Sequence, residues 1–132
     1  MLIENHKTRL RESLRAVTWA IDSGPHENQR TIGFHAVAAI CDLLNIYLHQ
    51  ENLTDTSSDV SHKKLRSPRL ILDALPFEFP KKDEIADLLF KLESQREGLC
   101  YGKLRSEEET EVSLRIFGEL RHILGELGAD EH

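Results

Sequence analysis

Apolar residues recur at helical spacing in four long stretches of the chain, and nowhere at strand-like spacing. The first stretch runs from about residue 2 to 22, where Leu10 and Leu14 belong to one apolar face and charged residues fill the other positions. Gly24 suits a left-handed helix cap, and Pro25 cannot continue the helical hydrogen-bond ladder. We therefore predict that this helix ends near residue 22 and forms an antiparallel hairpin with the next one.

The second stretch, residues 28–49, is apolar over most of its circumference and contains no proline. At 1.5 Å per residue it would form a rod roughly 33 Å long. Its larger apolar residues are Ile32, Phe34, Val37, Ile40, Leu43, Leu44, Ile46, Tyr47 and Leu48. A helix of this kind has neighbours on several sides, so we predict the central helix of the fold here.

A polar segment and a short helix follow. Residues 52–59 are mostly Asn, Thr, Asp and Ser, whose side chains compete with backbone ladders, and we expect a long, mobile loop. Ser67 and Pro68 then predict the N-cap and first residue of a short helix that ends at about Ala74.

Two further long helices complete the pattern. The third spans about residues 82–97, and the fourth begins after a capping box formed by Ser106 and Glu109 and continues to Gly128. We expect the last four residues to fray. The chain thus predicts an all-α fold, an antiparallel up-and-down four-helix bundle with one extra short helix, in a single domain over residues 1–132.

Composition bears on the cellular location of the protein and on its classes of partner. The two cysteines, Cys41 and Cys100, lie in apolar helical patterns and make no disulfide framework, which favours a reducing, cytoplasmic location. No uninterrupted apolar run approaches about 18 residues, so we expect no membrane partner. The net charge of −6 argues against sequence-blind binding to nucleic acid, although residues 62–69 hold four permanent cations, a segment that is either solvated or a polyanion contact.

The sharper catalytic and metal signatures are absent, namely phosphate-binding glycine loops, cysteine pairs at zinc spacing and His-Glu-x-x-His. We expect no cofactor and no metal, because His35, His49 and the cysteines supply no close ligand pair. We expect His49 to interact with the terminal carbonyls of its helix. Trp19 is expected in the core or in a dimer interface.

Two arginine-led motifs remain, Asn28-Gln29-Arg30-Thr31-Ile32-Gly33-Phe34-His35 and Gln95-Arg96-Glu97-Gly98-Leu99-Cys100-Tyr101-Gly102-Lys103. Their pairing ahead of an acidic-capped last helix resembles the HEPN superfamily over about residues 15–124. The resemblance implies an antiparallel four-helix bundle and frequent homodimers. In active members it implies metal-independent RNA cleavage by an Arg-x(4 to 6)-His motif near the end of the third long helix. Many members are toxins whose antitoxin is a small nucleotidyltransferase.

The chain departs from the active pattern because Tyr101 stands where the motif that begins at Arg96 would have its histidine. RNA cleavage through the 2′-hydroxyl needs a group that exchanges protons near neutrality, as imidazole does at a pKa of about 6.5 and phenol at about 10 does poorly. Arg96 and Lys103 can still hold a phosphate, and Tyr101 can still stack on a base. The alternative is a buried Arg96 that pairs with Glu93 or Glu97 while Tyr101 packs on the last helix.

Arg30 and His35 have the same spacing but lie on the second helix. Five residues correspond to roughly 500° of helical rotation, so the two side chains point about 140° apart and do not easily grip one phosphate. The structural interpretation makes Arg30 a partner of a carboxylate at the helix start and His35 a half-buried, hydrogen-bonded side chain. The functional interpretation places either residue in one cleft with Arg96.

Three hypotheses follow. We favour a HEPN-like homodimer that binds a nucleotide, RNA or a partner protein near Arg96, Tyr101 and Lys103 without ribonuclease activity, within a toxin-antitoxin-type system. The second is a metal-independent toxin endoribonuclease that uses Arg96 or the pair Arg30 and His35. The third is an interaction module whose apolar dimer face is its function.

Overall fold

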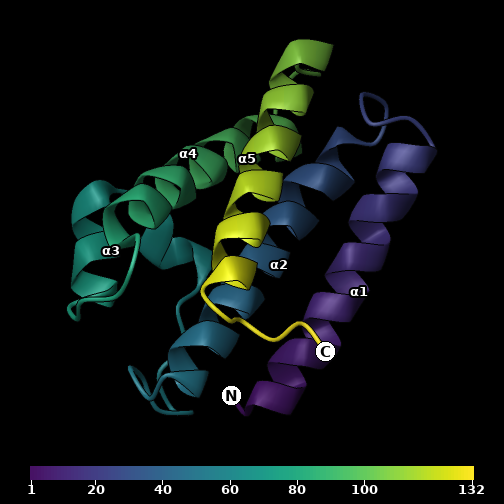
Figure 1. Ribbon diagram of the computed structural model, residues 1–132. Coiled ribbons are helices and arrows are strands. Elements are labelled where there is room, and N and C mark those ends of the chain that lie inside the picture. The colour runs from purple at the N-terminus through teal and green to yellow at the C-terminus, as the bar shows by residue number, and fades with distance from the viewer.

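The computed structural model describes residues 1–132 and is all-α, as the periodicity predicts (Figure 1). Its elements in chain order are α1 (Ile3–Asp22), α2 (Gln29–Gln50), the 3-10 turn η1 (His62–Leu65), α3 (Pro68–Ala74), α4 (Lys82–Cys100) and α5 (Glu107–Glu126). Each predicted helix is present within a few residues of its expected bounds. The largest difference is at the end of α4, which continues to Cys100.

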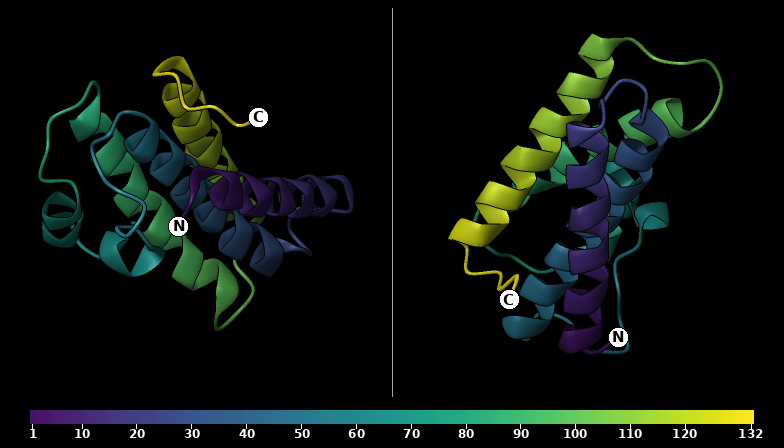
Figure 2. Two further views of the ribbon diagram at one scale, coloured as in Figure 1. Left: turned by 90° about the horizontal axis from the view of Figure 1, so that it is seen from below. Right: turned by 90° about the vertical axis from the view of Figure 1, so that its right-hand side faces the viewer.

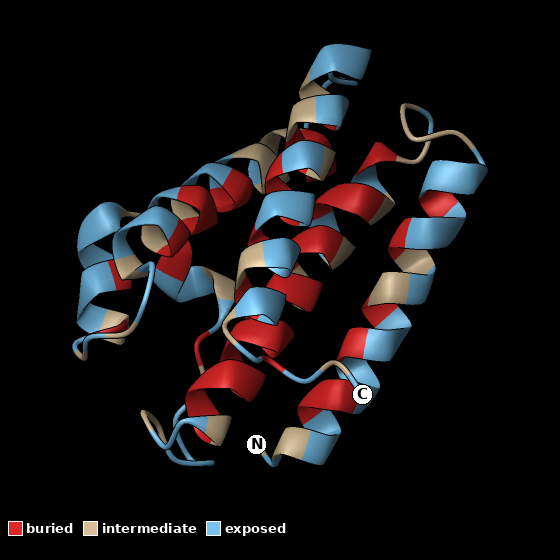
Figure 3. Ribbon diagram, in the orientation of Figure 1, coloured by how far each residue is buried: buried red, intermediate tan, exposed pale blue.

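The helix α2 is central. It packs along α1 on one side and against α4 and α5 on the other, and α4 and α5 also pack against each other (Figures 1 and 2). Buried residues cover most of its length (Figure 3). Its fully buried side chains include Ile32, Ile40, Leu43, Leu44, Ile46 and Leu48. The expectation of a helix with neighbours on several sides is confirmed.

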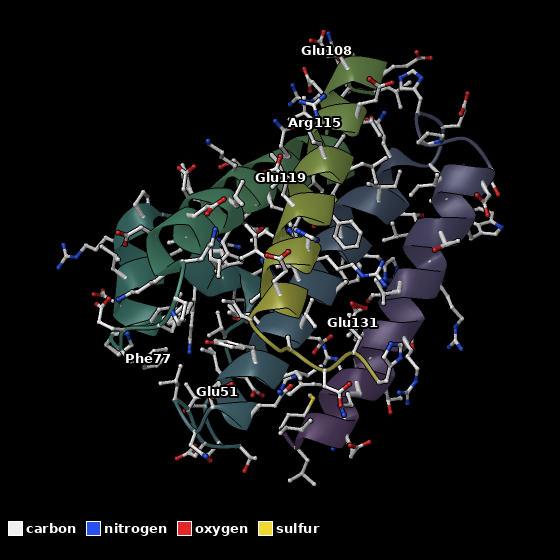
Figure 4. All side chains as sticks on the ribbon, viewed as in Figure 1. Glu51, Phe77, Glu108, Arg115, Glu119 and Glu131 are labelled. Carbon is white, nitrogen blue, oxygen red and sulfur yellow. The ribbon has the colours of Figure 1, made fainter.

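By length and composition α2 is also the one helix apolar enough to cross a membrane. This property is shared by core helices of soluble proteins, and 78% of its most apolar window is buried among the other helices. By contrast, one face of α5 is exposed to solvent and carries Glu108, Arg115 and Glu119 (Figure 4).

The predicted helix ends are confirmed where a specific cap was expected. Gly24 adopts a left-handed conformation with φ of +114° after α1. The Ser67 hydroxyl accepts a hydrogen bond from the backbone N–H of Leu70 at 3.1 Å, and Pro68 is the first residue of α3. The Ser106 hydroxyl likewise accepts from the backbone N–H of Glu109 at 3.2 Å.

Two segments that we expected to be mobile are attached to α2. The side chain of Asn45 donates to the carbonyl of Val60 at 2.9 Å and accepts from its N–H at 2.8 Å, which holds the end of the polar loop. After α5, Gln50 donates to the carbonyl of Gly128 at 2.9 Å and accepts from the N–H of Asp130 at 2.8 Å. The tail returns toward the N-terminal part of α1, where Lys7 donates to Asp130 at 3.0 Å (Figure 2). The tail is therefore held rather than frayed as we expected, because the amide side chain of Gln50 bonds its backbone and Lys7 bonds Asp130.

Close contact between α2 and the end of α4 depends on Gly33. A Cβ atom at this position would lie 2.9 Å from Cβ of Leu99 and 3.0 Å from Sγ of Cys100, which is closer than packed side chains approach. Glycine therefore lets the last turns of α4 lie directly on α2, and this contact places Arg96 beside the residues that follow Gly33.

Candidate functional site

Arg96 lies near the end of α4 with only 12% of its side chain exposed. Its Nη1 is 3.7 Å from Oε1 of Glu93, which is an ion pair but too long for a hydrogen bond. Its Cζ lies 5.7 Å from the centre of the Phe34 ring, within the range of a cation–π interaction. The guanidinium makes no hydrogen bond within the protein, so its five N–H donors are free for a ligand or for water.

Two cavities meet at Arg96. The first, of about 260 Å³, lies between α1, α2 and the segment before η1, and Phe34, Val37 and Asp42 help to line it. The second, of about 410 Å³, lies between η1 and α4. We call the lining of this second cavity the Arg96 groove; it consists of His62, Arg66, Glu93, Ser94, Arg96, Glu97 and Tyr101.

His62 is the imidazole that sequence reasoning did not assign to the Arg96 groove. Its Nδ1 lies 3.4 Å from Oε1 of Glu93, across from the guanidinium. Burial lowers the pKa of His62, and the nearby cations Arg96 and Arg66 lower it further. Burial raises the pKa of Glu93, partly opposed by the same two arginines. Nδ1 of His62 and Oε2 of Glu93 are buried without a hydrogen-bond partner in the protein.

Arg30 and His35 line a third, more open cavity of about 300 Å³ together with Phe34 and Tyr101. Arg30 and His35 thus border one cavity despite the helical rotation between them, and Cys100 and Tyr101 at the end of α4 complete its lining. Arg30 is exposed and has no carboxylate within ion-pair distance, so the expected pairing at the helix start is absent. Phe34 lines both the first and the third cavities, and Tyr101 lines both the third cavity and the Arg96 groove.

His35 has the half-buried, hydrogen-bonded environment of the structural interpretation. Its Nδ1 lies 3.3 Å from the hydroxyl of Ser13 on α1, and its ring stands edge-on to Phe34 at 5.0 Å. Burial lowers its pKa, partly opposed by the charge of Glu12. His35 is thus neutral near pH 7.

Tyr101 and Lys103 fall on the exposed segment after α4. Tyr101 is 61% exposed and lines both the Arg96 groove and the third cavity, so it does not pack on α5. Lys103 is exposed and lines neither of the cavities that meet at Arg96. Lys103 lies three residues after the end of α4 at Cys100, and the expectation that it lines the groove is wrong.

The cysteines offer no reactive thiolate. Burial raises the pKa of Cys41 to about 12. Burial likewise raises the pKa of Cys100, partly opposed by Arg96 and Arg30. Both thiols are free.

A second polar cluster lies at the other end of the first cavity. Nδ1 of His6 donates to Oδ1 of Asp42 at 2.7 Å, and Nε2 of His6 and of His49 each lie 3.1 Å from Oδ1 of Asp59. His49 therefore contacts the loop, including Thr54, rather than the terminal carbonyls of α2. We call these four residues, His6, Asp42, His49 and Asp59, the His–Asp cluster.

A sequence signal for part of this cluster exists. Asp42 and His49 are seven residues apart, two turns on one face of α2. The predicted hairpin brings the start of α1, and so His6, opposite the end of α2. Asp59 carries no such signal, because it lies in a polar loop without periodicity.

Comparison with protein-family models, curated proteins and solved structures finds no match to this chain.

Proposed function

We propose that the protein binds a phosphate-bearing ligand, a nucleotide or RNA, in the Arg96 groove. The observation that carries this proposal is the state of Arg96, a guanidinium that is nearly buried, makes no hydrogen bond within the protein and lines two cavities. Arginine is costly to bury without a partner, and its planar fork matches the oxygens of a phosphate.

Charge in the inner part of the groove supports an anionic ligand. Arg66 and Arg96 are permanent cations and share the groove with two carboxyl groups, Glu93 and the exposed Glu97. Burial raises the pKa of Glu93 and so weakens the negative charge beside Arg96. The buried, unpartnered Nδ1 of His62 provides a further polar atom for a ligand. These features are those of a site that is completed by hydrogen bonds from outside the chain.

Aromatic residues beside the groove support a ligand that carries a base. Phe34 is 51% exposed and Tyr101 is 61% exposed, and both lie within reach of the arginines that line the cavities. Exposed aromatic rings next to guanidinium groups stack bases of single-stranded RNA without reading sequence. This combination favours a nucleotide or RNA over an unrelated anion.

The test is fluorescence anisotropy with the full chain and a labelled, mixed-sequence RNA oligonucleotide, at one fixed salt concentration because such affinities depend on salt. Arg96→Gln removes charge-assisted hydrogen bonds worth about 1.5–3 kcal/mol each, so we expect at least a tenfold loss of affinity. Arg66→Gln should weaken binding by a smaller factor. Arg115→Gln, on the exposed face of α5, is the matched control and should bind as the unmodified protein does.

Equal affinity of Arg96→Gln and Arg115→Gln for RNA would remove the groove as the binding site. Weak binding that tracks only the total number of positive charges would do the same, because a local site predicts a difference between the two variants. A competition with free nucleotide then separates a nucleotide site from an RNA site.

Ribonuclease activity is the second candidate function, and His62 is the observation that favours it. A neutral imidazole can accept the proton of a 2′-hydroxyl, and a carboxyl whose pKa is raised can return one to the leaving oxygen. In this mechanism His62 takes the proton from the 2′-hydroxyl, Glu93 gives one to the leaving oxygen, and Arg96 holds the phosphate. RNA cleavage that persists in EDTA and is lost in His62→Gln would establish it, whereas bound but intact RNA supports binding alone. Cleavage lost in His35→Gln but kept in His62→Gln would instead assign it to the pair Arg30 and His35.

We further propose, from the resemblance to the HEPN superfamily, that the fold is an antiparallel four-helix bundle and that the protein is a cytoplasmic homodimer. The same resemblance suggests a small nucleotidyltransferase as its partner in a toxin-antitoxin-type system. Packing of α2 against α1, α4 and α5 supports the bundle. Trp19, a large apolar side chain on α1 that is 57% exposed, supports the dimer. Sedimentation of the protein beside Trp19→Ser tests that face: a dimer that dissociates in the variant supports it, and a monomer in both contradicts it.

A further inference from the structure

Two buried imidazoles and a carboxylate converge where the start of α1 meets the end of α2. Ligand atoms of His6, His49 and Asp59 lie within 4.8 Å of one another. His6 is 2% exposed and His49 is 6% exposed, so the fold holds both rings in its interior and not on a mobile surface. The three residues come from a helix start, a helix end and a loop, and the loop is held in place by the hydrogen bonds between Asn45 and Val60.

The outer nitrogen of each ring has its own acceptor. Nδ1 of His6 donates to the buried carboxylate of Asp42 at 2.7 Å. Nδ1 of His49 lies 2.8 Å from the hydroxyl of Thr54 and 3.4 Å from its carbonyl oxygen. Histidines that bind metals use one nitrogen for the ion and donate the other N–H to a carboxylate or carbonyl, which fixes the tautomer and the ring plane. Both Nε2 atoms are therefore presented to one point beside Asp59.

The distances between these atoms suit a shared cation. Both nitrogens of His6 face carboxylate oxygens, Nδ1 that of Asp42 at 2.7 Å and Nε2 that of Asp59 at 3.1 Å. His49 and His6 also share the same oxygen of Asp59, at 3.1 Å each. A tetrahedral ion with bonds of about 2.0–2.1 Å holds its ligand atoms roughly 3.3 Å apart, close to these separations.

We propose that His6, His49 and Asp59 bind a divalent transition-metal ion, with Zn²⁺ the best fit. The ligands are Nε2 of each histidine and a carboxylate oxygen of Asp59, and Asp42 and Thr54 orient the rings. Two imidazoles with one carboxylate suit Zn²⁺ and other late first-row ions, and suit Mg²⁺ or Ca²⁺ poorly. This inference is independent of the Arg96 groove and of the function proposed for it.

Three protein ligands leave one position of a tetrahedral ion open. His6 and Asp59 line the cavity of about 260 Å³ that Arg96 also lines, so the open position faces that cavity. Water or an anionic group would occupy it. The site thus belongs to the open type that binds or activates a small molecule, and not to the closed type that only supports a fold.

Two neighbouring cations limit the affinity for a metal ion. The amino group of Met1 donates to Oδ2 of Asp59 at 3.1 Å and to the ligand oxygen Oδ1 at 3.4 Å, so an ion would compete with it for Oδ1. Arg9 lies 3.7 Å from Oδ2 of Asp42, an oxygen that the ion does not use, and lowers the affinity through charge repulsion alone.

The experiment uses the full chain without a polyhistidine tag, stripped with EDTA and exchanged into metal-free solution. ZnCl₂ is titrated by calorimetry, and CoCl₂ by visible absorption, which reports ligands and geometry. We expect one ion per chain and a Co²⁺ spectrum that differs from that of the aqueous ion. Loss of a ligand in His6→Gln, His49→Gln or Asp59→Asn should weaken Zn²⁺ binding by about 100-fold or more, and Asp42→Asn by about 10- to 100-fold.

Matched controls are His122→Gln, an exposed histidine on α5, and Asp55→Asn, an exposed aspartate in the same loop as Asp59. Both should bind Zn²⁺ as the unmodified protein does. Equal affinity in Asp59→Asn and Asp55→Asn, or loss of binding in His122→Gln, overturns the proposal. Where a ligand variant fails to fold, the Co²⁺ spectrum of the unmodified protein decides: a ligand-shifted spectrum supports the site, and the spectrum of the aqueous ion overturns it.

Discussion

The two polar clusters of this protein differ in how completely they are paired. In the His–Asp cluster, both nitrogens of His6 have carboxylate partners at 2.7 and 3.1 Å. In the Arg96 groove the corresponding separations are 3.4 Å between His62 and Glu93 and 3.7 Å between Arg96 and Glu93. In the His–Asp cluster the polar atoms of His6 are paired within the protein, whereas the Arg96 groove has polar groups left for a ligand. Degree of pairing, rather than charge alone, distinguishes the two.

The largest expected effect is on the stability of the fold and comes from a substitution in the His–Asp cluster. Asp42 is 4% exposed and accepts from His6, so Asp42→Asn removes the carboxylate acceptor of a buried imidazole and should cost about 1.5–3 kcal/mol of the free energy of unfolding. Asp87→Asn is the control, because Asp87 pairs with Lys91 at 2.8 Å on the exposed face of α4 and should cost less than about 0.5 kcal/mol. Urea denaturation measures both. Equal midpoints for the two variants would mean that His6 does not depend on Asp42.

The next largest effect is on stability and comes from the contact between α2 and α4 at Gly33, which positions Arg96. In Gly33→Ala the new Cβ would meet Leu99 and Cys100 at 2.9 and 3.0 Å, and we expect a net loss of about 1 kcal/mol after the better helix propensity of alanine is included. Gly118→Ala on α5 has nothing within 4 Å of its Cβ and should gain about 0.5–1 kcal/mol. Thermal unfolding compares the two. A stabilised Gly33→Ala would show that α2 and α4 are not in close contact there.

The smallest expected effect is a gain in stability at pH 7 in Glu93→Gln, opposite in sign to the loss expected for Asp42→Asn. Burial raises the pKa of Glu93 above its usual 4.5, so the folded protein binds this proton more tightly than the unfolded chain does. The stabilisation is present below pH 4.5 and is lost as the pH rises through the folded pKa. Glutamine never ionises, so Glu93→Gln should be more stable than the unmodified protein at pH 7, by less than about 1 kcal/mol because Glu93 is only partly desolvated.

Urea denaturation at pH 4 and pH 7 measures this difference. The two proteins should converge in stability at the lower pH, where Glu93 is protonated. A Glu93→Gln variant that is less stable at pH 7 than the unmodified protein would show that the ion pair with Arg96 outweighs burial.

The helices were predictable because their signals are local. Periodicity gave α1, α2, α4 and α5, and the side chains of Ser67 and Ser106 cap their helices as expected. The attachment of the polar loop and of the C-terminal tail to α2 was not predictable, because Asn45 and Gln50 hold segments that are remote in sequence. A buried amide on an apolar helix carries no sign of which backbone it will satisfy.

The candidate site was predictable only in part, for the same reason. Arg96 and Tyr101 line the groove as expected, and their position follows from the end of α4. His62 was interpreted as part of a solvated basic segment, because nothing local indicates that η1 folds back beside Glu93. Lys103 was assigned to the groove from its place in the same motif as Arg96 and Tyr101, but it is not part of the groove lining.

The central claim is that Arg96 holds a phosphate, and the most direct measurement is the ¹H–¹⁵N spectrum of the arginine Nε–H groups during titration with RNA. If the claim is correct, the signals of Arg96 and Arg66 shift and saturate together while that of Arg115 stays in place. Saturating RNA that leaves the Arg96 signal unmoved would contradict it.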